Sequence, residues 1–186
     1  MGSRPEEGEY LQGFQRAPRA VKKRLIVHGA AAVVFARVLR VVGGGVGVAP
    51  LLFFGKRLKD SGITPTFLLG VRTASDMLEY DMFCQTGRVL ITTEDGSFGE
   101  KGFVTNHSAL ASEKFDLISM CGPKPMMAAM AHYAYKNGIE CEASLENKMA
   151  CGLGACLCCV EKTTEGNVCV CKEGPVINIK KLLWQI

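Results

Sequence analysis

The sequence has few of the features that mark the commonest classes of protein. It contains a single Trp and three scattered His among 186 residues, and its longest apolar run, 41–55, is interrupted by Gly and Pro. A helix needs about 20 apolar residues to span a bilayer, so we expect no membrane segment. No Ser, His and Asp arrangement and no pair of carboxylates suggests catalysis, so we predict no catalytic residue. The first residues do not resemble a secretory signal, which favours a cytoplasmic protein.

The net charge of +4 comes from one end of the chain. Residues 1–40 hold eight basic and three acidic residues, whereas the rest of the chain holds 14 basic and 15 acidic residues. The body therefore lacks the basic face with interleaved aromatic residues that is typical of nucleic-acid binding, and we expect no such partner. Residues 1–40 are rich in Arg and Ala, and Arg40 is poorly suited to a buried strand. We expect this atypical segment to be poorly ordered or loosely helical.

Cysteine gives the first positive signal. Six of the nine cysteines lie between residues 151 and 171. An odd number argues against a secreted disulfide framework, and tight clustering favours a metal site. Cys151, Cys156 and Cys159 have the C-x4-C-x2-C spacing of plant-type [2Fe–2S] ligands, with Cys169 or Cys171 as the fourth. A zinc site and free thiols are the alternatives, although structural zinc more often uses paired C-x2-C knuckles.

Strand and helix patterns alternate between residues 38 and 144. Short apolar runs predict strands, and segments with apolar residues at helical spacing, bounded by Pro or Gly, predict helices. This alternation is typical of an α/β fold in which helices cover both faces of a doubly wound parallel sheet. The predicted strands are 38–42, 66–69, 89–92, 115–120 and 139–145, and the predicted helices are 50–60, 75–83 and 125–137.

A glycine-rich turn follows the first predicted strand and precedes the first predicted helix. Gly43, Gly44, Gly45 and Gly47 would let the backbone approach a pyrophosphate, whose charge is stabilised by the N-terminus of a helix that begins near Pro50. The turn departs from a strict G-x-G-x-x-G pattern, so a turn needed only for packing is the alternative.

Further candidates follow the other predicted strands, at the edge where open α/β sheets bind ligands. Arg72 could meet a nucleotide phosphate or simply be exposed. Asp95 begins a glycine-rich loop that could contact an adenosine or only turn the chain. Cys121, with Gly122 and Pro123, could lie beside a reactive ring or be an ordinary buried cysteine.

The composition of the sequence changes after residue 144, where the hydrophobic periodicity ends and Cys and Gly become frequent. We therefore divide the chain into an atypical segment at 1–40, an NAD-binding-like module at 41–144 and a [2Fe–2S] cluster domain at 145–186. The last part is too short to build its own hydrophobic core, so we expect a metal to hold it together.

Several stretches resemble the electron-transfer subunit of class 1B dihydroorotate dehydrogenase. They are GGGVGVAPL at 43–51, DGSFGEKG at 95–102, CGPKPMM at 121–127 and SLENKMACGLGAC at 144–156. The similar ending VCKEGPV at 170–176 favours Cys171 as the fourth cluster ligand. The resemblance runs from about residue 41 to the C-terminus.

The resemblance implies a ferredoxin-reductase-like subunit with an FAD-binding β-barrel, an NAD module and a [2Fe–2S] domain. It implies that electrons from dihydroorotate leave an FMN-containing catalytic subunit and cross the cluster and FAD to NAD+, in pyrimidine biosynthesis and within a heterotetramer. The residues before Gly43 do not match the barrel and are too few for its six strands, which need about 50 residues or more. We therefore expect a truncated chain that retains FAD poorly.

Two other functions are compatible with the same motifs. The first is a related flavin and iron–sulfur reductase subunit, of the sulfide dehydrogenase or NADPH:ferredoxin oxidoreductase type. The second is a non-catalytic metal-binding module that has lost its barrel.

Overall fold

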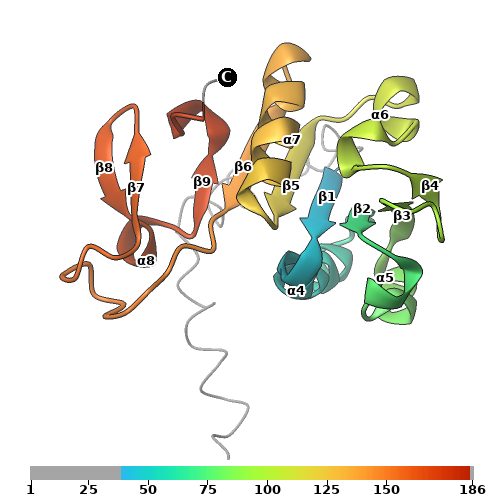
Figure 1. The fold of residues 1–186 in the computed structure, drawn as a ribbon, viewed down its shortest axis with the longest axis horizontal. Coiled ribbons are helices and arrows are strands. Elements are labelled where there is room, and N and C mark those ends of the chain that lie inside the picture. The colour runs from blue at the N-terminus through green and yellow to red at the C-terminus, as the bar shows by residue number, and fades with distance from the viewer. Residues whose placement is uncertain (1–38, 185–186) are drawn as a thin grey trace, which may run out of the picture.

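A seven-stranded sheet forms the centre of the molecule, with helices on both faces and a separate two-stranded hairpin beside it (Figure 1). The computed structural model describes residues 39–184, so the expectation for residues 1–38 lies outside the described residues. The sheet contains β1 (Leu39–Gly44), β2 (Thr66–Val71), β3 (Arg88–Thr93), β4 (Glu100–Lys101), β5 (Leu117–Cys121), β6 (Glu140–Ser144) and β9 (Val176–Asn178), and the hairpin contains β7 (Val160–Thr163) and β8 (Gly166–Cys169).

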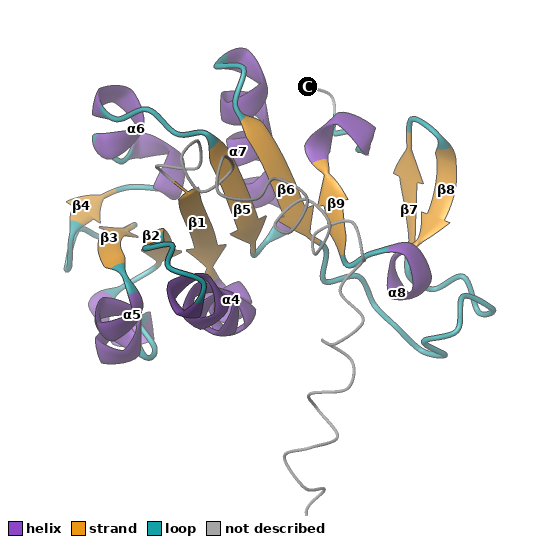
Figure 2. Ribbon diagram, turned by 180° about the vertical axis from the view of Figure 1, so that it is seen from behind, coloured by secondary structure: helices purple, strands orange, loops and turns teal. Residues whose placement is uncertain are grey.

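Helices cover the sheet from both sides, with α4 and α5 on one face and α6 and α7 on the other (Figure 2). A short helix, α8, follows the hairpin and lies beside it. The helices are α4 (Val48–Asp60), α5 (Tyr80–Thr86), α6 (Ala109–Ser112), α7 (Lys124–Lys136) and α8 (Val170–Glu173), and 3₁₀ turns occupy Gly45–Gly47, Ala74–Asp76, Val104–Asn106 and Ile179–Lys181.

The strand order β4-β3-β2-β1-β5-β6-β9 places β1 at the centre, paired in parallel with β2 on one side and β5 on the other. The chain runs outward from β1 through β2, β3 and β4, then crosses back to β5 and β6. Within β1, Val41 packs into the core under α4, whereas Val42 packs into the core under α7. The doubly wound parallel sheet predicted from the sequence is therefore confirmed, and its centre is buried on both faces as such sheets require.

The predicted helix at 75–83 overlaps α5 only at 80–83, and its predicted start is wrong. Ala74–Asp76 forms only a short 3₁₀ turn, closed by a hydrogen bond of 3.2 Å from the backbone N–H of Thr73 to Oδ2 of Asp76. Glu79 then adopts a left-handed conformation with φ of 58°, which a right-handed helix cannot contain. Consequently α5 begins only at Tyr80. The other predicted strands and helices each overlap an observed element.

Arg40 does not belong to an atypical segment, because it lies in the central strand β1 and is fully buried. Its guanidinium forms an ion pair of 3.0 Å with Glu113 and stacks 3.8 Å from the ring centre of Phe115. The expected boundary at residue 40 is therefore corrected to Leu39, where β1 begins. A carboxylate and an aromatic ring from a distant segment make a charged residue acceptable at this position.

The C-terminal region contributes directly to the sheet and to its core. Strand β9 pairs antiparallel with β6, and Ile177, Ile179 and Leu182 share one hydrophobic core with Met127 and Met130 of α7. The sequence predicts that a metal holds residues 145–186 together, because they are too few to form their own core. The structure gives this region a second means of support, since its last part is packed onto the α/β module.

Candidate functional site

The glycine-rich turn lies where the strand order of the sheet reverses. The chain leaves β1 toward β2 on one side and later returns to β5 on the other, so the ends of β1 and β5 diverge into loops on opposite faces. Ligands of open α/β sheets bind at this switch point, outside the carboxyl ends of the strands. Here the turn 45–47 and the segment Cys121–Pro123 meet at that point.

Packing requires a glycine at position 47 of the turn. A Cβ on Gly47 would lie 2.7 Å from the backbone of Cys121 and Gly122, whereas a Cβ on Gly44 would lie 2.5 Å from Sδ of Met126, a flexible side chain. Gly43 also faces only side chains. The packing alternative weighed for this turn is therefore strongest at Gly47. Its small size lets the loop after β1 lie directly against the loop after β5.

Gly45 differs from its neighbours, because a Cβ there would meet nothing within 4 Å. Its φ of 54° is the left-handed conformation that glycine adopts most easily. The adjacent Val46 is 88% exposed. The outer part of the turn is thus open to an incoming molecule.

The N-terminus of α4 faces this open part of the turn. The helix begins at Val48, and Pro50 lies in its first turn. Among the described residues no side chain caps this end, and its first turn contains no acidic residue. The N–H of Val48 bonds to the carbonyl oxygens of Gly45 and Val46, and Pro50 has no N–H, so it is mainly the helix dipole that favours an anion such as a phosphate here.

Cys121 ends β5 beneath the switch point, and its side chain is fully buried in the core under α4. Burial raises the pKa of its thiol to about 11, and the nearby carboxylate of Glu146, 3.8 Å from Sγ, acts in the same direction. The residue is placed at the predicted edge but stays a neutral thiol. Gly122 and Pro123 follow it, and Pro123 provides the N-cap of α7.

Arg72 and Asp95 follow β2 and β3 at the same edge of the sheet. Arg72 is exposed. The Asp95 carboxylate accepts hydrogen bonds from the hydroxyl and backbone N–H of Ser97, at 2.6 and 2.9 Å, and these bonds lower its pKa. The same hydroxyl accepts a bond of 2.8 Å from the N–H of Ala74. Asp95 therefore orders its own loop and joins it to the segment after β2.

The cysteine-rich loop runs between β6 and β7 and directs backbone N–H groups at sulfur atoms. Sγ of Cys151 accepts from the N–H of Cys156 at 3.4 Å and of Leu153 at 3.3 Å, and these bonds lower its pKa to about 6. Sγ of Cys159 accepts from the N–H of Cys171 at 3.4 Å, which lowers its pKa as well. Amides directed at sulfur stabilise the thiolate form that binds metals.

The predicted ligands lie close to one another in the chain's fold, since Cys151 accepts from the backbone N–H of Cys156 and Cys159 accepts from the backbone N–H of Cys171. Cys169 instead directs its thiol at the carbonyl oxygen of Gly154, 3.7 Å away. Within residues 39–184, no three Cys, His, Asp or Glu side chains are already gathered around one point as metal ligands would be. The donor set nevertheless suits an iron–sulfur group, because it consists of thiols with backbone amides directed at two of them.

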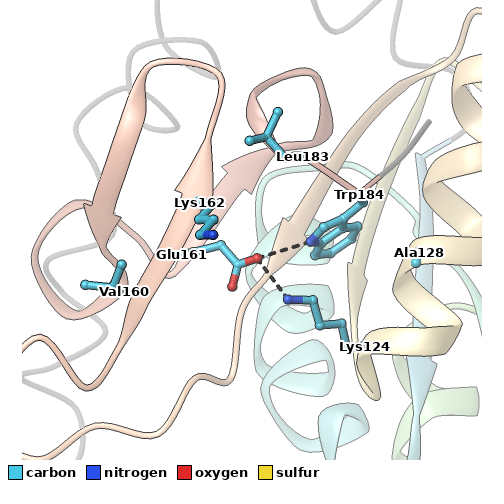
Figure 3. Close-up of a pocket in the computed structure, with 7 residues that line it drawn as sticks. All are labelled: Lys124, Ala128, Val160, Glu161, Lys162, Leu183 and Trp184. Atoms are coloured by element: carbon cyan, nitrogen blue, oxygen red, sulfur yellow. Dashed lines mark hydrogen bonds and ion pairs between the residues drawn. The ribbon is translucent and has the colours of Figure 1, made fainter.

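Sequence reasoning missed a buried carboxylate beside this loop. Glu161 of β7 accepts hydrogen bonds from Lys124, Trp184 and Asn147, and it lines a cleft of about 460 Å³ together with Lys124 and Trp184 (Figure 3). Burial by itself raises the pKa of Glu161, but the three hydrogen bonds outweigh burial and lower it. Only the alternation of Glu161 with exposed Lys162 hinted at an inward-facing carboxylate.

Two family models match the chain in succession. Residues 41–132 match the oxidoreductase NAD-binding domain, and residues 146–183 match the iron-sulfur cluster binding domain of dihydroorotate dehydrogenase B. A probable dihydroorotate dehydrogenase B (NAD(+)) electron transfer subunit from Methanocaldococcus jannaschii is 43% identical over 138 residues. Over residues 41–183 the chain resembles the electron transfer subunits of dihydroorotate dehydrogenase B. The expected NAD-binding and iron–sulfur modules are thereby confirmed.

Other members of this electron transfer family match to the same extent. The subunit from Caldanaerobacter subterraneus subsp. tengcongensis is 41% identical over 148 residues, which are 77% of this chain and 58% of that protein. The Methanocaldococcus match covers 73% of this chain and 52% of its relative. The chain thus spans a little over half the length of these relatives.

A solved structure supports the same fold. The NADH-dependent reduced ferredoxin-NADP oxidoreductase structure, described in the context of flavin-based electron bifurcation, has a TM-score of 0.70 and 33% sequence identity. The match covers 80% of this chain and 54% of that chain. The ferredoxin-reductase-like module predicted from the sequence is therefore confirmed. Within residues 39–184, no helix has both the length and the apolar character needed to cross a bilayer.

Proposed function

We propose that this chain is part of an electron-transfer subunit that carries electrons between a [2Fe–2S] cluster and NAD(H) for a dihydroorotate-oxidising partner. One observation carries the proposal: the glycine-rich nucleotide turn follows β1 and the cysteine-rich loop follows β6, and only β5 lies between these two strands of one sheet. The loop starts directly after β6, and β6 pairs with β5, whose end packs against the turn. Both redox sites therefore belong to one rigid unit.

We propose Cys151, Cys156, Cys159 and Cys171 as the cluster ligands. A [2Fe–2S] cluster takes four thiolates, and backbone N–H groups directed at Sγ of Cys151 and Cys159 favour the thiolate form at two of these positions. Cys171 is preferred to Cys169 because it contacts Cys159 with both its N–H and its side chain.

For the nucleotide, we propose that the diphosphate lies over Gly45 and the N-terminus of α4. Gly45 leaves open space there, and the helix end is free to receive an anion. Arg72 is exposed at the same edge and could pair with a phosphate. Asp95 would shape the neighbouring loop through Ser97.

A nicotinamide exchanges two electrons as a hydride, whereas an iron–sulfur cluster passes them singly, so a flavin is needed between the two. We propose that FAD supplies this conversion and is held by a barrel of the kind that the resemblance implies, which the residues before Gly43 do not match. The partner would be an FMN-containing catalytic subunit in a cytoplasmic heterotetramer, and the net reaction would convert dihydroorotate and NAD+ to orotate, NADH and a proton.

A second candidate is a reductase subunit that exchanges electrons with ferredoxin. The observation that favours it is the 33% identity and TM-score of 0.70 with the NADH-dependent reduced ferredoxin-NADP oxidoreductase structure. Adding purified catalytic subunit and dihydroorotate should produce NADH under the first proposal. NADH-dependent ferredoxin reduction without any response to dihydroorotate would favour the second candidate.

The cluster assignment is tested on the anaerobically purified chain. It should contain about two irons per chain and lose them in Cys171→Ser, whereas Cys169→Ser should retain them. Zinc in place of iron, or the opposite behaviour of the two serine variants, would contradict the ligand set. Gly45→Glu should weaken NADH binding while the visible spectrum of the cluster stays the same, because it adds an anion at the proposed phosphate position.

A further inference from the structure

The carboxylate of Glu161 is buried next to a proposed cluster ligand. Its side chain is only 10% exposed, and it follows Cys159 by two residues. Oε1 accepts from Nζ of Lys124 at 2.9 Å and from Nε1 of Trp184 at 3.3 Å, while Oε2 accepts from Nδ2 of Asn147 at 3.2 Å (Figure 3). Both oxygens are therefore engaged, and all partners are donors.

The three donors come from three different segments of the chain. Lys124 is the first residue of α7 and follows Cys121–Pro123 directly. Asn147 lies between β6 and the cysteine-rich loop, and Trp184 lies beyond β9. The Lys124 side chain is 62% exposed, so its ion pair with Glu161 adds little to stability. The polar arrangement instead fixes direction, because each hydrogen bond holds its segment at one angle to β7.

Asn147 extends the contact to the cysteine itself. Its Nδ2 also lies 3.4 Å from the carbonyl oxygen of Cys159, which accepts a second bond of 3.1 Å from the N–H of Val170. At the other end, Lys124 belongs to the segment whose Gly122 lies against Gly44 of the nucleotide turn. A continuous path of polar contacts thus joins the backbone of Cys159 to the end of β5.

We propose that Glu161 is a positioning residue that orients Cys159, through Asn147, and holds the cysteine-rich loop against the nucleotide-binding end of β5, through Lys124. The inference rests on the proposed function for the identity of the metal group at Cys159. Glu161 touches neither that group nor the nucleotide. Its effect is on the distance and angle between the two sites.

The decisive variant is Glu161→Gln, which keeps the shape of the side chain. A glutamine has one acceptor oxygen and one donor NH₂ group, so it cannot accept from all three donors, and one donor must face another. Removing a partner that orients a metal ligand weakens metal binding by about 10- to 100-fold. We expect chelators to remove iron correspondingly faster from this variant, and the electron paramagnetic resonance spectrum of the reduced cluster to change shape.

Trp184 supplies a readout that needs no cluster. It is the only Trp of the chain, so fluorescence excited at its absorption edge reports on this site alone. In Glu161→Gln we expect stronger quenching of Trp184 by acrylamide, because a neutral amide oxygen holds the indole N–H more weakly than a carboxylate does. Lys124→Met should change the spectrum of the reduced cluster in the same way. Lys124→Arg should keep the spectrum of the unmodified chain, because arginine keeps a positive donor for the carboxylate.

Glu165→Gln is the matched control. Glu165 lies in the turn of the same hairpin and forms an ion pair of 2.7 Å with Lys181, but both side chains are exposed. The variant Glu165→Gln should show the same iron release, cluster spectrum and Trp184 quenching as the unmodified chain. If Glu161→Gln matches this control in all three measurements, Glu161 has no positioning role. An unmodified chain that binds no iron would contradict the proposed function, and Trp184 quenching would still test the contacts of Glu161 in that chain.

Discussion

Replacing Gly47 with Ala should test whether the nucleotide turn is held by close packing against β5. The new Cβ would lie 2.7 Å from three backbone atoms of Cys121 and Gly122, and backbone atoms in a central sheet cannot move aside easily. The φ of Gly47 is −66°, which suits alanine, so the substitution introduces a clash without backbone strain. Overpacking of this kind costs about 1–3 kcal/mol of unfolding free energy.

That cost corresponds to a fall in melting temperature of about 2–12 °C, since 1 kcal/mol shifts a domain of this size by about 2–4 °C. Circular dichroism melting of the full chain measures it. Gly45→Ala is the matched control, because its Cβ meets open space and the only cost is the left-handed backbone, about 1–2 kcal/mol. NADH affinity should fall in Gly47→Ala because α4 and the loop after β5 are pushed apart. A Gly47→Ala chain with unchanged melting and NADH affinity would refute the packing argument.

Two other predictions concern charged groups at the opposite end of the sheet. Glu113→Gln should destabilise the chain by about 3–5 kcal/mol in urea unfolding, because it leaves the fully buried Arg40 without its carboxylate. Arg40→Met should cost far less, since Glu113 keeps Arg88 as a partner at 2.9 Å; equal losses in the two variants would contradict this account. Burial lowers the pKa of His107 below its ordinary 6.5, and its neutral Nδ1 accepts from the N–H of Ala109. Its stabilising contribution is therefore present above pH 6.5 and is lost as the pH falls through the lower folded-state pKa, so the melting temperature should drop on acidification, and less steeply in His107→Asn.

The elements that could be predicted from the sequence are those with local signals. Apolar runs identified the central strands, and Pro50 and Gly62 bracketed α4. The break before α5 depends instead on one residue, Glu79, in a left-handed conformation that its side chain does not favour. Strand β9 has only three residues and no alternating pattern, so it becomes a strand because β6 offers it hydrogen-bonding groups.

In the candidate site, too, the residues with local sequence signals could be predicted and those that depend on distant partners could not. Cysteine spacing and glycine clustering are local patterns, so the cysteine-rich loop and the nucleotide turn could be found by reading along the chain. Arg40 was judged unsuitable for a buried strand because its partner Glu113 is 73 residues away. Glu161 was overlooked for the same reason, since its donors Lys124 and Trp184 are 37 and 23 residues distant.

The pairing of β6 with β9 has a consequence for metal binding. The segment 145–175, which contains the cysteine-rich loop, leaves the sheet after β6 and returns to it at β9, and the N–H of Leu145 donates to the carbonyl oxygen of Pro175 at 2.9 Å where the two ends meet. The sheet therefore closes this long segment without a metal, and the entropy of bringing its ends together is lost on folding and not on metal capture. A strand that contains no cysteine would thus raise the affinity of the four proposed cysteine ligands for a metal.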